Sequence, residues 1–565
     1  MYPLRGKTLA KYAVLITFED VFWRRPELRE LDALLAKYQR NEIIFLLGNL
    51  NCLLGTWQND VDFEMDDKLA RWLLPSYAIQ IDKIRRATNG RVLFSRITLL
   101  YLIKRAFTSC PDTGAMPNNA EGFDAIGRSC LMANDLMLPF MPSPDDRTLE
   151  KLANILPFSD YMPLDQYTVD IARAQAMFEI ATREPALKQR SDFVDLASEF
   201  YAAFNMSHIT FSEMAFGCSS KFLKLSLNDL ASPEAMILRS TFFQRSAIPP
   251  HAAQRFFEKL AISETLLMQK VRDSVAQPHN DFTLFQKYPV IELAPTIYVC
   301  LDVGFLVEKA GRALFWTIFS ELPKAQQTRL SSFWGAVFET YVNSIFGEHY
   351  KAKGRFTVEP RFLNGDPAFD ACLFEGERLI VFEHKRSTIR ADCKYGDDVA
   401  KLKAELDLKF VKDDDNANKG VAQLSKGIIR FLDGESLDGV SSKNVRRIYP
   451  VLICLGNIAS VPYFGRYLSE QFYTCFRRKK YRQAVTPVMT LNISDVENIL
   501  GYLEKFRLSD ILDSRYTKDR GMLSSFSASK VPLLENVQPA INMVRERFAV
   551  FGKRMEEDLF PGQEN

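Results

Sequence analysis

The sequence predicts an α/β protein in which a mixed central sheet flanked by helices follows a large, mainly α-helical N-terminal region. Up to about residue 285, apolar residues recur every three or four positions, which is the period of an amphipathic helix. Beyond that point, short β-branched runs alternate with helical segments, a pattern typical of an α/β layer. The chain has 565 residues, of which 47% are apolar and 43 are Phe, so it can bury large cores.

The N-terminal region is expected to consist mainly of separate helices. The segments that fit a helical period best are 27–38, 66–74, 96–107, 149–156, 168–181, 192–204 and 252–275. Thr148, Ser191 and Ser212 are expected to cap helices, because a side-chain hydroxyl can accept a hydrogen bond from a free N–H of the first turn. Prolines within 137–145 predict an internal break.

The second half is expected to alternate strands and helices. A β-hairpin is predicted over 288–301, and helices are predicted near 303–320 and 326–347. Further strands are expected near 355–362, 369–374, 378–385, 446–455 and 486–492, and further helices near 396–410, 418–432, 462–476, 494–505 and 534–555. The chain then divides into a helical region (1–285), a connecting hairpin and helix (286–325), an α/β domain (326–510) and a C-terminal linker with one helix (511–565).

Composition and charge exclude several classes of protein. The 72 basic and 70 acidic side chains give a net charge of +2, which argues against a protein that coats a polyanion along its whole length. The nine cysteines are dispersed, which favours free thiols in a reducing compartment and disfavours a structural zinc site. The apolar run 13–18 is a poor signal peptide, and no stretch reaches the roughly 18 to 20 apolar residues of a membrane span. We therefore expect a cytoplasmic protein without a membrane partner.

The most informative chemistry lies in a predicted hairpin. Glu375-Gly376-Glu377 separates two apolar runs, and a two-residue loop at Gly376-Glu377 places Asp370 directly opposite Glu383. If the loop is shifted by one residue, Glu383 remains a diagonal neighbour of Asp370. Because side chains alternate along a strand, Glu383 and Lys385 share one face and His384 points to the other.

These side chains suit metal-assisted hydrolysis of a phosphodiester. The carboxylates of Asp370 and Glu383 are the ligands that Mg²⁺ or Mn²⁺ prefers. The ammonium of Lys385 can orient a water molecule or stabilise negative charge that develops on a phosphate. The alternative is a surface hairpin on which Glu383 and Lys385 form a weak ion pair.

With Asp370 on one strand and Glu383-His384-Lys385 on the next, the chain resembles the PD-(D/E)xK phosphodiesterase superfamily, whose fold is that of restriction endonucleases. The resemblance covers about residues 326–510 and implies a metal-dependent endonuclease with catalytic residues on this hairpin. Phe369 stands where the family has Pro, and Asp366-Pro367 lies nearby. Asp366 is therefore an alternative to Asp370 as the metal ligand.

The resemblance also implies functional residues on two helices. Glu339, within the predicted helix 326–347, matches the Glu that members often carry before the hairpin, and it is a candidate third metal ligand. Gln423 matches a Gln that members often carry on the helix after the hairpin, and it is a candidate catalytic residue. The alternative is that Glu339 is a solvated or ion-paired residue of its helix and that Gln423 is a polar residue of an amphipathic helix without a function.

A large helical region joined to such a nuclease resembles bacterial proteins of defence against phage or foreign DNA. The region 1–285 would then sense a signal or dock on a partner protein, and a homo-oligomer stays open. Two alternatives to an active endonuclease also stay open. One is an inactive nuclease fold that binds nucleic acid or serves as a scaffold, and the other is a ribonuclease that is active only with a partner.

Positive charge is concentrated in residues 440–483, which we call the basic segment. Its nine basic side chains face a single acid, Glu470: Lys443, Arg446, Arg447, Arg466, Arg477, Arg478, Lys479, Lys480 and Arg482. Such a segment beside a metal site would neutralise phosphates and bind nucleic acid. The resemblance to restriction endonucleases implies DNA more than RNA as this partner. The predicted nucleic-acid-binding residues are Arg446, Arg447, Arg477, Arg478, Lys479, Lys480 and Arg482. A second basic stretch, residues 82–110, either extends this surface or forms the solvated face of a helix pair.

Overall fold

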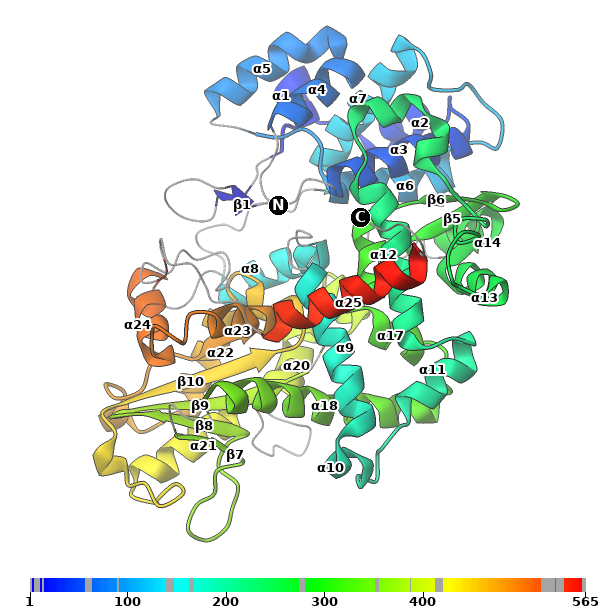
Figure 1. The fold of residues 1–565 in the computed structure, drawn as a ribbon. Helices are drawn as coiled ribbons and strands as arrows, with labels where there is room; N and C mark the ends of the chain where they lie inside the picture. Colours follow the sequence, from blue (N-terminus) through cyan, green and yellow to red (C-terminus); the bar gives the residue numbers. More distant parts are fainter. Residues whose placement is uncertain are drawn as a thin grey trace.

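The structure, a computed structural model, is a mixed α/β protein. It describes residues 3–4, 11–12, 15–55, 63–88, 91–137, 147–161, 167–273, 280–350, 355–386, 388–411, 420–519, 534 and 543–560. Figure 1 shows N-terminal helices at one end of the molecule and a mixed sheet at the other, with further helices between them. Within these ranges, no helix has both the length and the hydrophobicity that a membrane crossing requires.

The N-terminal part is helical, as the sequence predicts. Its first helices are α1 (Phe18–Phe22), α2 (Leu28–Leu35), α3 (Arg40–Gly55), α4 (Phe63–Leu73), α5 (Ala78–Ala87), α6 (Arg96–Ser109), α7 (Ala120–Met137) and α8 (Thr148–Ile155). They are followed by α9 (Tyr167–Arg183), α10 (Pro185–Lys188), α11 (Leu196–Phe204) and α12 (His208–Leu223). The predicted break at 137–145 falls outside the described residues except for Met137.

The predicted helix over 252–275 is wrong. The structure has α13 (Pro250–Leu260), the short strand β4 (Ala261–Ser263) and α14 (Glu264–Asp273) in its place. β4 pairs in parallel with β5 (Val290–Ala294), which forms the predicted hairpin with β6 (Ile297–Cys300); β3 (Leu238–Arg239) completes this four-stranded sheet. The hydrogen bonds that make β4 a strand come from distant residues, so the local helical period does not reveal them.

The predicted caps and one further helix also differ from the structure. Thr148 is the first residue of α8 and Ser212 lies inside α12, whereas Asp195 and Ser207 cap α11 and α12. The predicted helix 303–320 is split into α16 (Val303–Ala310) and α17 (Leu314–Phe319). A Cβ on Gly311, between them, would lie 3.0 Å from the main chain of Asp170, so close packing against α9 accompanies the break.

The second half of the chain forms a five-stranded mixed sheet with the order β11-β10-β9-β8-β7. Its strands are β7 (Arg355–Val358), β8 (Ala371–Glu375), β9 (Arg378–Lys385), β10 (Arg447–Cys454) and β11 (Met489–Asn492). Pairing is antiparallel from β7 to β9 and parallel from β9 to β11. This agrees with the prediction of a mixed sheet flanked by helices.

Helices cover both faces of this sheet (Figure 1). On one face, Ile380 and Phe382 share a core with Val337 and Phe338 of α18 (Lys324–Tyr350). On the other face, Val381 and its strand neighbours pack with α20 (Val399–Phe410), α21 (Val421–Leu432) and α22 (Phe464–Cys475). Successive side chains of β9 therefore enter two different helix layers. The remaining helices of this part are α15 (Thr283–Lys287), α19 (Ala391–Lys394), α23 (Ile493–Leu500), α24 (Leu508–Asp519) and α25 (Met543–Leu559).

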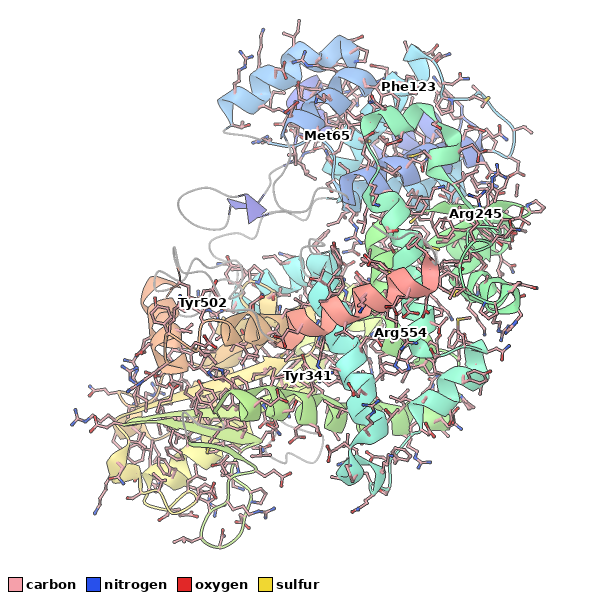
Figure 2. All side chains as sticks on the ribbon, in the orientation of Figure 1. Met65, Phe123, Arg245, Tyr341, Tyr502 and Arg554 are labelled. Atoms are coloured by element: carbon pink, nitrogen blue, oxygen red, sulfur yellow. The ribbon has the colours of Figure 1, made fainter. Side chains whose placement is uncertain are left out.

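Ion pairs to buried carboxylates join helices of the N-terminal part to helices that come later in the chain. Arg173 of α9 lies 2.6 Å from Glu497 of α23, and the hydroxyl of Tyr341 on α18 donates to the same carboxylate at 2.6 Å. Arg554 of α25 pairs with the fully buried Glu213 of α12 at 3.1 Å; Figure 2 labels Tyr341 and Arg554 near the middle of the molecule. The same hydrophobic core runs from α9 and α12 to α18 and the sheet, so α18 is held in place from both sides.

Candidate metal centre

Asp370 lies directly before β8 and beside the end of β9. Ala371 pairs with Phe382 and Glu375 pairs with Arg378, which is the register that the Gly376-Glu377 loop predicts. Gly376 has a φ of +65°, a left-handed conformation that glycine adopts without strain in such a turn. The register confirms that Asp370 lies across from Glu383.

The Asp370 carboxylate is bound to the main chain of β9. Its Oδ2 accepts a hydrogen bond from the N–H of His384 at 2.7 Å, and the Asp370 N–H donates to the carbonyl of Phe382 at 3.2 Å. The Asp370 carboxylate thus accepts the His384 N–H in place of a main-chain carbonyl, directly before β8 begins. At this position the carboxylate interacts with groups from both faces of the sheet, Glu383 on one and His384 on the other.

One side of the site is formed by Glu383 and Lys385. Glu383 is only 1% exposed, its Oε1 accepts a hydrogen bond from Lys385 Nζ, and its Oε2 has no hydrogen-bond partner among the described residues. Burial raises the pKa of Glu383 to about 7; Lys385 opposes this shift and Asp370 adds to it. Burial alone would lower the pKa of Lys385, but the nearby carboxylates raise it above its ordinary value, so the ammonium stays charged.

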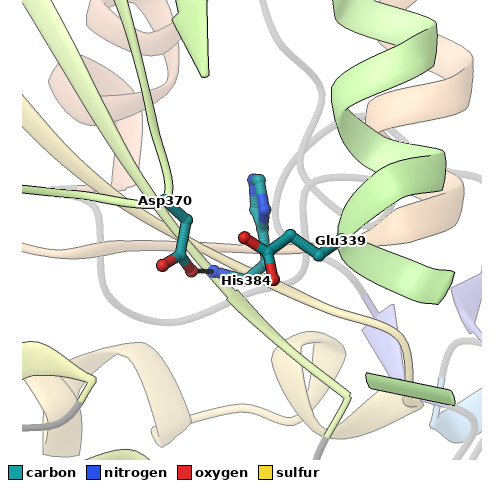
Figure 3. A group of neighbouring side chains, drawn as sticks. All are labelled: Glu339, Asp370 and His384. Atoms are coloured by element: carbon teal, nitrogen blue, oxygen red, sulfur yellow. Dashed lines mark hydrogen bonds between the residues drawn. The ribbon is translucent and has the colours of Figure 1, made fainter. Parts of the chain in front are cut away.

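The other side of the site brings together Glu339, Asp370 and His384. Each offers a ligand atom, and these atoms lie within 4.8 Å of one another. Figure 3 shows Glu339 reaching from its helix toward Asp370 and His384 at the strand ends. His384 is 7% exposed, and neither of its ring nitrogens has a hydrogen-bond partner in the described parts of the chain. Burial lowers the pKa of His384 to about 4, so its imidazole is neutral near pH 7.

Glu339 carries a proton more readily than an ordinary glutamate. Burial raises its pKa to about 7, and the negative charges of Asp370 and Glu359 add to the shift, whereas Lys385 and Arg190 oppose it. The pKa of Glu383 is raised by the same two effects, burial and the charge of Asp370. A cluster of carboxyl groups that resist ionisation in this way is one that a divalent cation would stabilise in its ionised form.

The structure brings together two of the three predicted ligands, Asp370, Glu383 and Glu339. Asp370 and Glu339 belong to one cluster, but Glu383 is outside it, and His384 takes its place. The reason is strand alternation, which turns Glu383 toward α20 and α21, while His384 faces α18 and Glu339. The sequence signal for His384 was strand alternation, which points its side chain to the face opposite Glu383.

The structure places Asp366 and Asp370 differently relative to the cluster. Asp366 is exposed and pairs with Arg430 of α21 at 3.0 Å, so it lies outside the cluster. Asp370 is the residue that the hydrogen bond to β9 holds in place.

Gln423 and the residue before its helix lie on the Glu383 side. Gln423 is in the first turn of α21, which packs on that face of the sheet, and its side chain is half-buried. The main chain of Gly420, at the N-terminus of α21, favours the ionised form of Glu383. Gly420 has a φ of +53°, and a Cβ there would lie 2.0 Å from the carbonyl oxygen of Phe410. This position requires glycine.

The expectation that the basic segment lies beside the metal site is wrong for its predicted nucleic-acid-binding residues. β10 runs parallel to β9, with Arg447 beside Arg378 and Cys454 beside Lys385, so Arg446 and Arg447 lie at the opposite end of the sheet. Val485 bridges to Ile448 at that same end, which brings the residues before it there as well. The residues concerned are Arg477, Arg478, Lys479, Lys480 and Arg482, and all five are exposed.

Several cations of the basic segment have acidic partners. Arg446 pairs with Glu377 at 2.9 Å and Arg447 pairs with Asp513 at 3.2 Å. Arg478 lies 3.3 Å from Asp433, which Lys480 approaches at 3.8 Å. Exposed pairs of this kind are weak, so the side chains can exchange these partners for phosphates.

The second basic stretch is largely structural. Arg85 pairs with Asp66, and Arg96 forms a buried bidentate pair with Asp302. Arg91 also pairs with Asp20, and Arg105 pairs with Asp32. These acids lie outside residues 82–110, so only the fold reveals that the charges are balanced.

A scan against protein-family models, a search of curated proteins and a search of solved structures found no match to this chain.

Proposed function

We propose that this protein is a divalent-metal-dependent endonuclease that hydrolyses phosphodiester bonds of nucleic acid, with DNA as the favoured substrate. The observation that carries the proposal is the meeting of Asp370, Glu339, Glu383 and Lys385 at one end of the sheet. Three separate elements contribute these side chains. Burial raises the free energy of their charged forms when no ligand is bound. The arrangement supports assignment of the domain to the PD-(D/E)xK superfamily.

The donor set fits a divalent cation. Glu339 and Asp370 offer oxygen ligands within 4.8 Å of each other. Glu383, outside this cluster but close enough for the charge of Asp370 to raise its pKa, has a buried Oε2 without a hydrogen-bond partner among the described residues. A bound cation would polarise the phosphate and lower the pKa of a water molecule. Glu339 and Asp370 would hold the cation.

Lys385 is the residue that best fits a role at the phosphate. Its ammonium is charged and is held by Glu383, which restricts its motion. A fixed positive charge at this position can orient an attacking water molecule and stabilise the charge that develops on the phosphate in the transition state. Gln423, in the first turn of α21, is positioned to contact a substrate on the same side.

Nucleic acid would bridge the candidate centre and the basic segment. Arg447 and Cys454 are seven residues apart along β10, which is about 23 Å at about 3.3 Å per residue. A duplex covers this length with about seven base pairs. The exposed cations Arg477 and Lys479 would then bind phosphates away from the scissile bond.

The biological role that we propose is defence against phage or other foreign DNA in the cytoplasm. This role rests on a resemblance: bacterial defence proteins also join a nuclease domain to a large helical region. In this role, the helices up to α12 sense a signal or dock on a partner, and they contact α18 through the core shared with α9 and α12. Movement of α18 would displace Glu339 from the site, which gives the helical region a route to control activity.

A cleavage assay tests the proposed activity. Labelled duplex DNA, single-stranded DNA and RNA are incubated with the protein and Mg²⁺ or Mn²⁺, alongside the variants Lys385→Ala and Glu383→Ala. We expect metal-dependent cleavage that both variants abolish and that EDTA prevents. Asp366→Asn is the matched control, because this exposed carboxylate lies outside the cluster and its variant should retain activity. If wild type cleaves none of the three substrates, or if Lys385→Ala cleaves like wild type, the proposal fails.

A further inference from the structure

We infer that His384 is a metal ligand, and that its imidazole makes the site select a divalent transition-metal ion over Mg²⁺. The ligand set is His384, Glu339 and Asp370, one nitrogen and two carboxylate oxygens. The inference deepens the proposed function and rests on its metal-binding part, but it does not depend on cleavage of nucleic acid.

The first argument is the state of the His384 ring. The side chain is 7% exposed, and both Nδ1 and Nε2 lack a hydrogen-bond partner among the described residues. Buried polar atoms are normally hydrogen-bonded, because a polar atom that loses its hydrogen bonds to water and gains no new partner destabilises the fold. Packing alone does not explain a histidine here, since Leu or Phe would fill the same space beside Phe382 without unpartnered nitrogens.

The second argument is where the ring points. A ring nitrogen of His384 lies within 4.8 Å of carboxylate oxygens of Glu339 and Asp370 (Figure 3). Neither carboxylate forms a hydrogen bond with the ring, so the three groups lie close together without satisfying one another. Three such ligands leave positions open for water or a phosphate oxygen, as in catalytic metal sites.

The third argument is that the ligands are held before any cation binds. Asp370 is bonded to the main-chain N–H of His384 itself, so the two residues cannot move independently. Glu339 lies in the middle of α18, between Phe338 and Tyr341, which are both buried in the core. Because the ligands are fixed in this way, the site cannot rearrange to suit different ions. The chemical type of its ligand atoms then determines which ion binds.

The selectivity follows from that chemistry. Mg²⁺ takes oxygen ligands almost exclusively and keeps several of its waters. Imidazole nitrogen binds first-row transition ions more strongly than Mg²⁺. With one neutral imidazole and two carboxylates, the site should therefore prefer Mn²⁺ or Co²⁺ to Mg²⁺.

Isothermal titration calorimetry of the full chain with Mn²⁺ and with Mg²⁺ tests the selectivity. We expect wild type to bind Mn²⁺ at least tenfold more tightly than Mg²⁺. In His384→Leu, the affinity for Mn²⁺ should fall at least tenfold, while the affinity for Mg²⁺ should change less than twofold. His251→Leu is the control for binding by a surface histidine, because His251 is exposed, and it should bind both ions like wild type.

Pulsed EPR of bound Mn²⁺ tests the ligand directly and needs no variant. In wild type, nitrogen hyperfine coupling from a histidine should appear, and ¹⁵N-histidine labelling should change it; His384→Leu should remove it. The inference is overturned if wild type shows no nitrogen coupling, if wild type fails to bind Mn²⁺, or if His384→Leu keeps the wild-type affinity for Mn²⁺. Nuclease activity is scored separately. Selective Mn²⁺ binding through His384 without cleavage refutes only the proposed function, and cleavage without this selectivity refutes only the inference.

Discussion

The carboxylate of Asp370 accepts a hydrogen bond from the main-chain N–H of His384, two residues of adjacent strands joined at 2.7 Å. The main-chain pairing between β8 and β9 ends at Ala371 and Phe382. Beyond it, the Asp370 side chain accepts the hydrogen bond from the His384 N–H that a main-chain carbonyl would otherwise accept. The same carboxylate lies next to Glu339 and influences the pKa of Glu383, so one side chain links the hairpin to both sides of the site.

Asp370→Asn should separate the structural role of Asp370 from its role as a ligand. The Asn side chain keeps an oxygen that can accept the N–H of His384, but it removes the negative charge that a cation requires. We expect urea unfolding of Asp370→Asn to differ from wild type by less than about 1 kcal/mol, and cleavage to fall at least about a hundredfold. Asp370→Ala should lose activity and, in addition, about 1 kcal/mol of stability. Equal stability of the two variants would show that the hydrogen bond does not hold the hairpin.

Glu339→Gln should stabilise the metal-free protein at alkaline pH. The pKa of Glu339 is raised to about 7 in the fold, so the folded protein holds this proton more tightly than the unfolded chain does. The contribution of this group to stability therefore falls as pH rises from about 4.5 to 7, and the neutral Gln avoids that loss. We expect Glu339→Gln to exceed wild type by on the order of 1 to 3 kcal/mol at pH 8 and to match it near pH 4.5. Urea unfolding in EDTA at the two pH values measures the difference.

Added Mn²⁺ should reverse this order at pH 8, because the cation binds wild type and not the variant. Asp366→Asn is the matched control with the opposite sign: the pKa of Asp366 is lowered by its hydrogen bonds to Asn364 and Arg430, so its substitution should not stabilise the protein at high pH. A Glu339→Gln variant that is no more stable than wild type at pH 8 in EDTA would contradict the raised pKa.

Gly420→Ala should destabilise the junction between α20 and α21. A Cβ at this position would lie 2.0 Å from the carbonyl oxygen of Phe410, and the φ of +53° disfavours a side chain as well. We expect a loss of at least about 2 kcal/mol in urea unfolding, together with weaker cleavage, because Gly420 precedes the helix that covers Glu383. Gly434→Ala is a suitable comparison, since it also has a positive φ, of +114°, but nothing lies within 4 Å of its Cβ position. Equal losses in both variants would show that backbone strain, and not the contact with Phe410, is responsible.

The basic segment should contribute to binding rather than to chemistry. Replacing Arg477, Arg478, Lys479 and Lys480 by Ala removes four exposed cations at the far end of the sheet. We expect weaker binding of a 20-base-pair duplex, with a slope of log affinity against log salt reduced by about 3 to 4. Cleavage at saturating DNA should change less than twofold. An unchanged salt slope in fluorescence anisotropy would rule out contact between these residues and phosphates.

Elements defined by local patterns were predicted well. The hairpin register followed from Gly376-Glu377, and the pairing of Ala371 with Phe382 confirms it. The shared face of Glu383 and Lys385 followed from alternation and is confirmed by their ion pair. Features that depend on distant residues were predicted poorly. β4 forms only because it pairs with β5. Arg446 and Arg447 lie far from the site because β10 runs parallel to β9.

The sequence by itself determined the pair of strands, the alternation of side chains along β9 and the types of group at its end, because hairpin pairing and strand geometry are local. Only the tertiary structure decided which of those groups meet. The packing of α18 on one face brings Glu339 to His384 and leaves Glu383 on the other, and the parallel alignment of β10 with β9 carries Arg446 and Arg447 away from the site. The physical reason is that long-range packing selects which of two opposite strand faces receives each helix, and no local period encodes that choice.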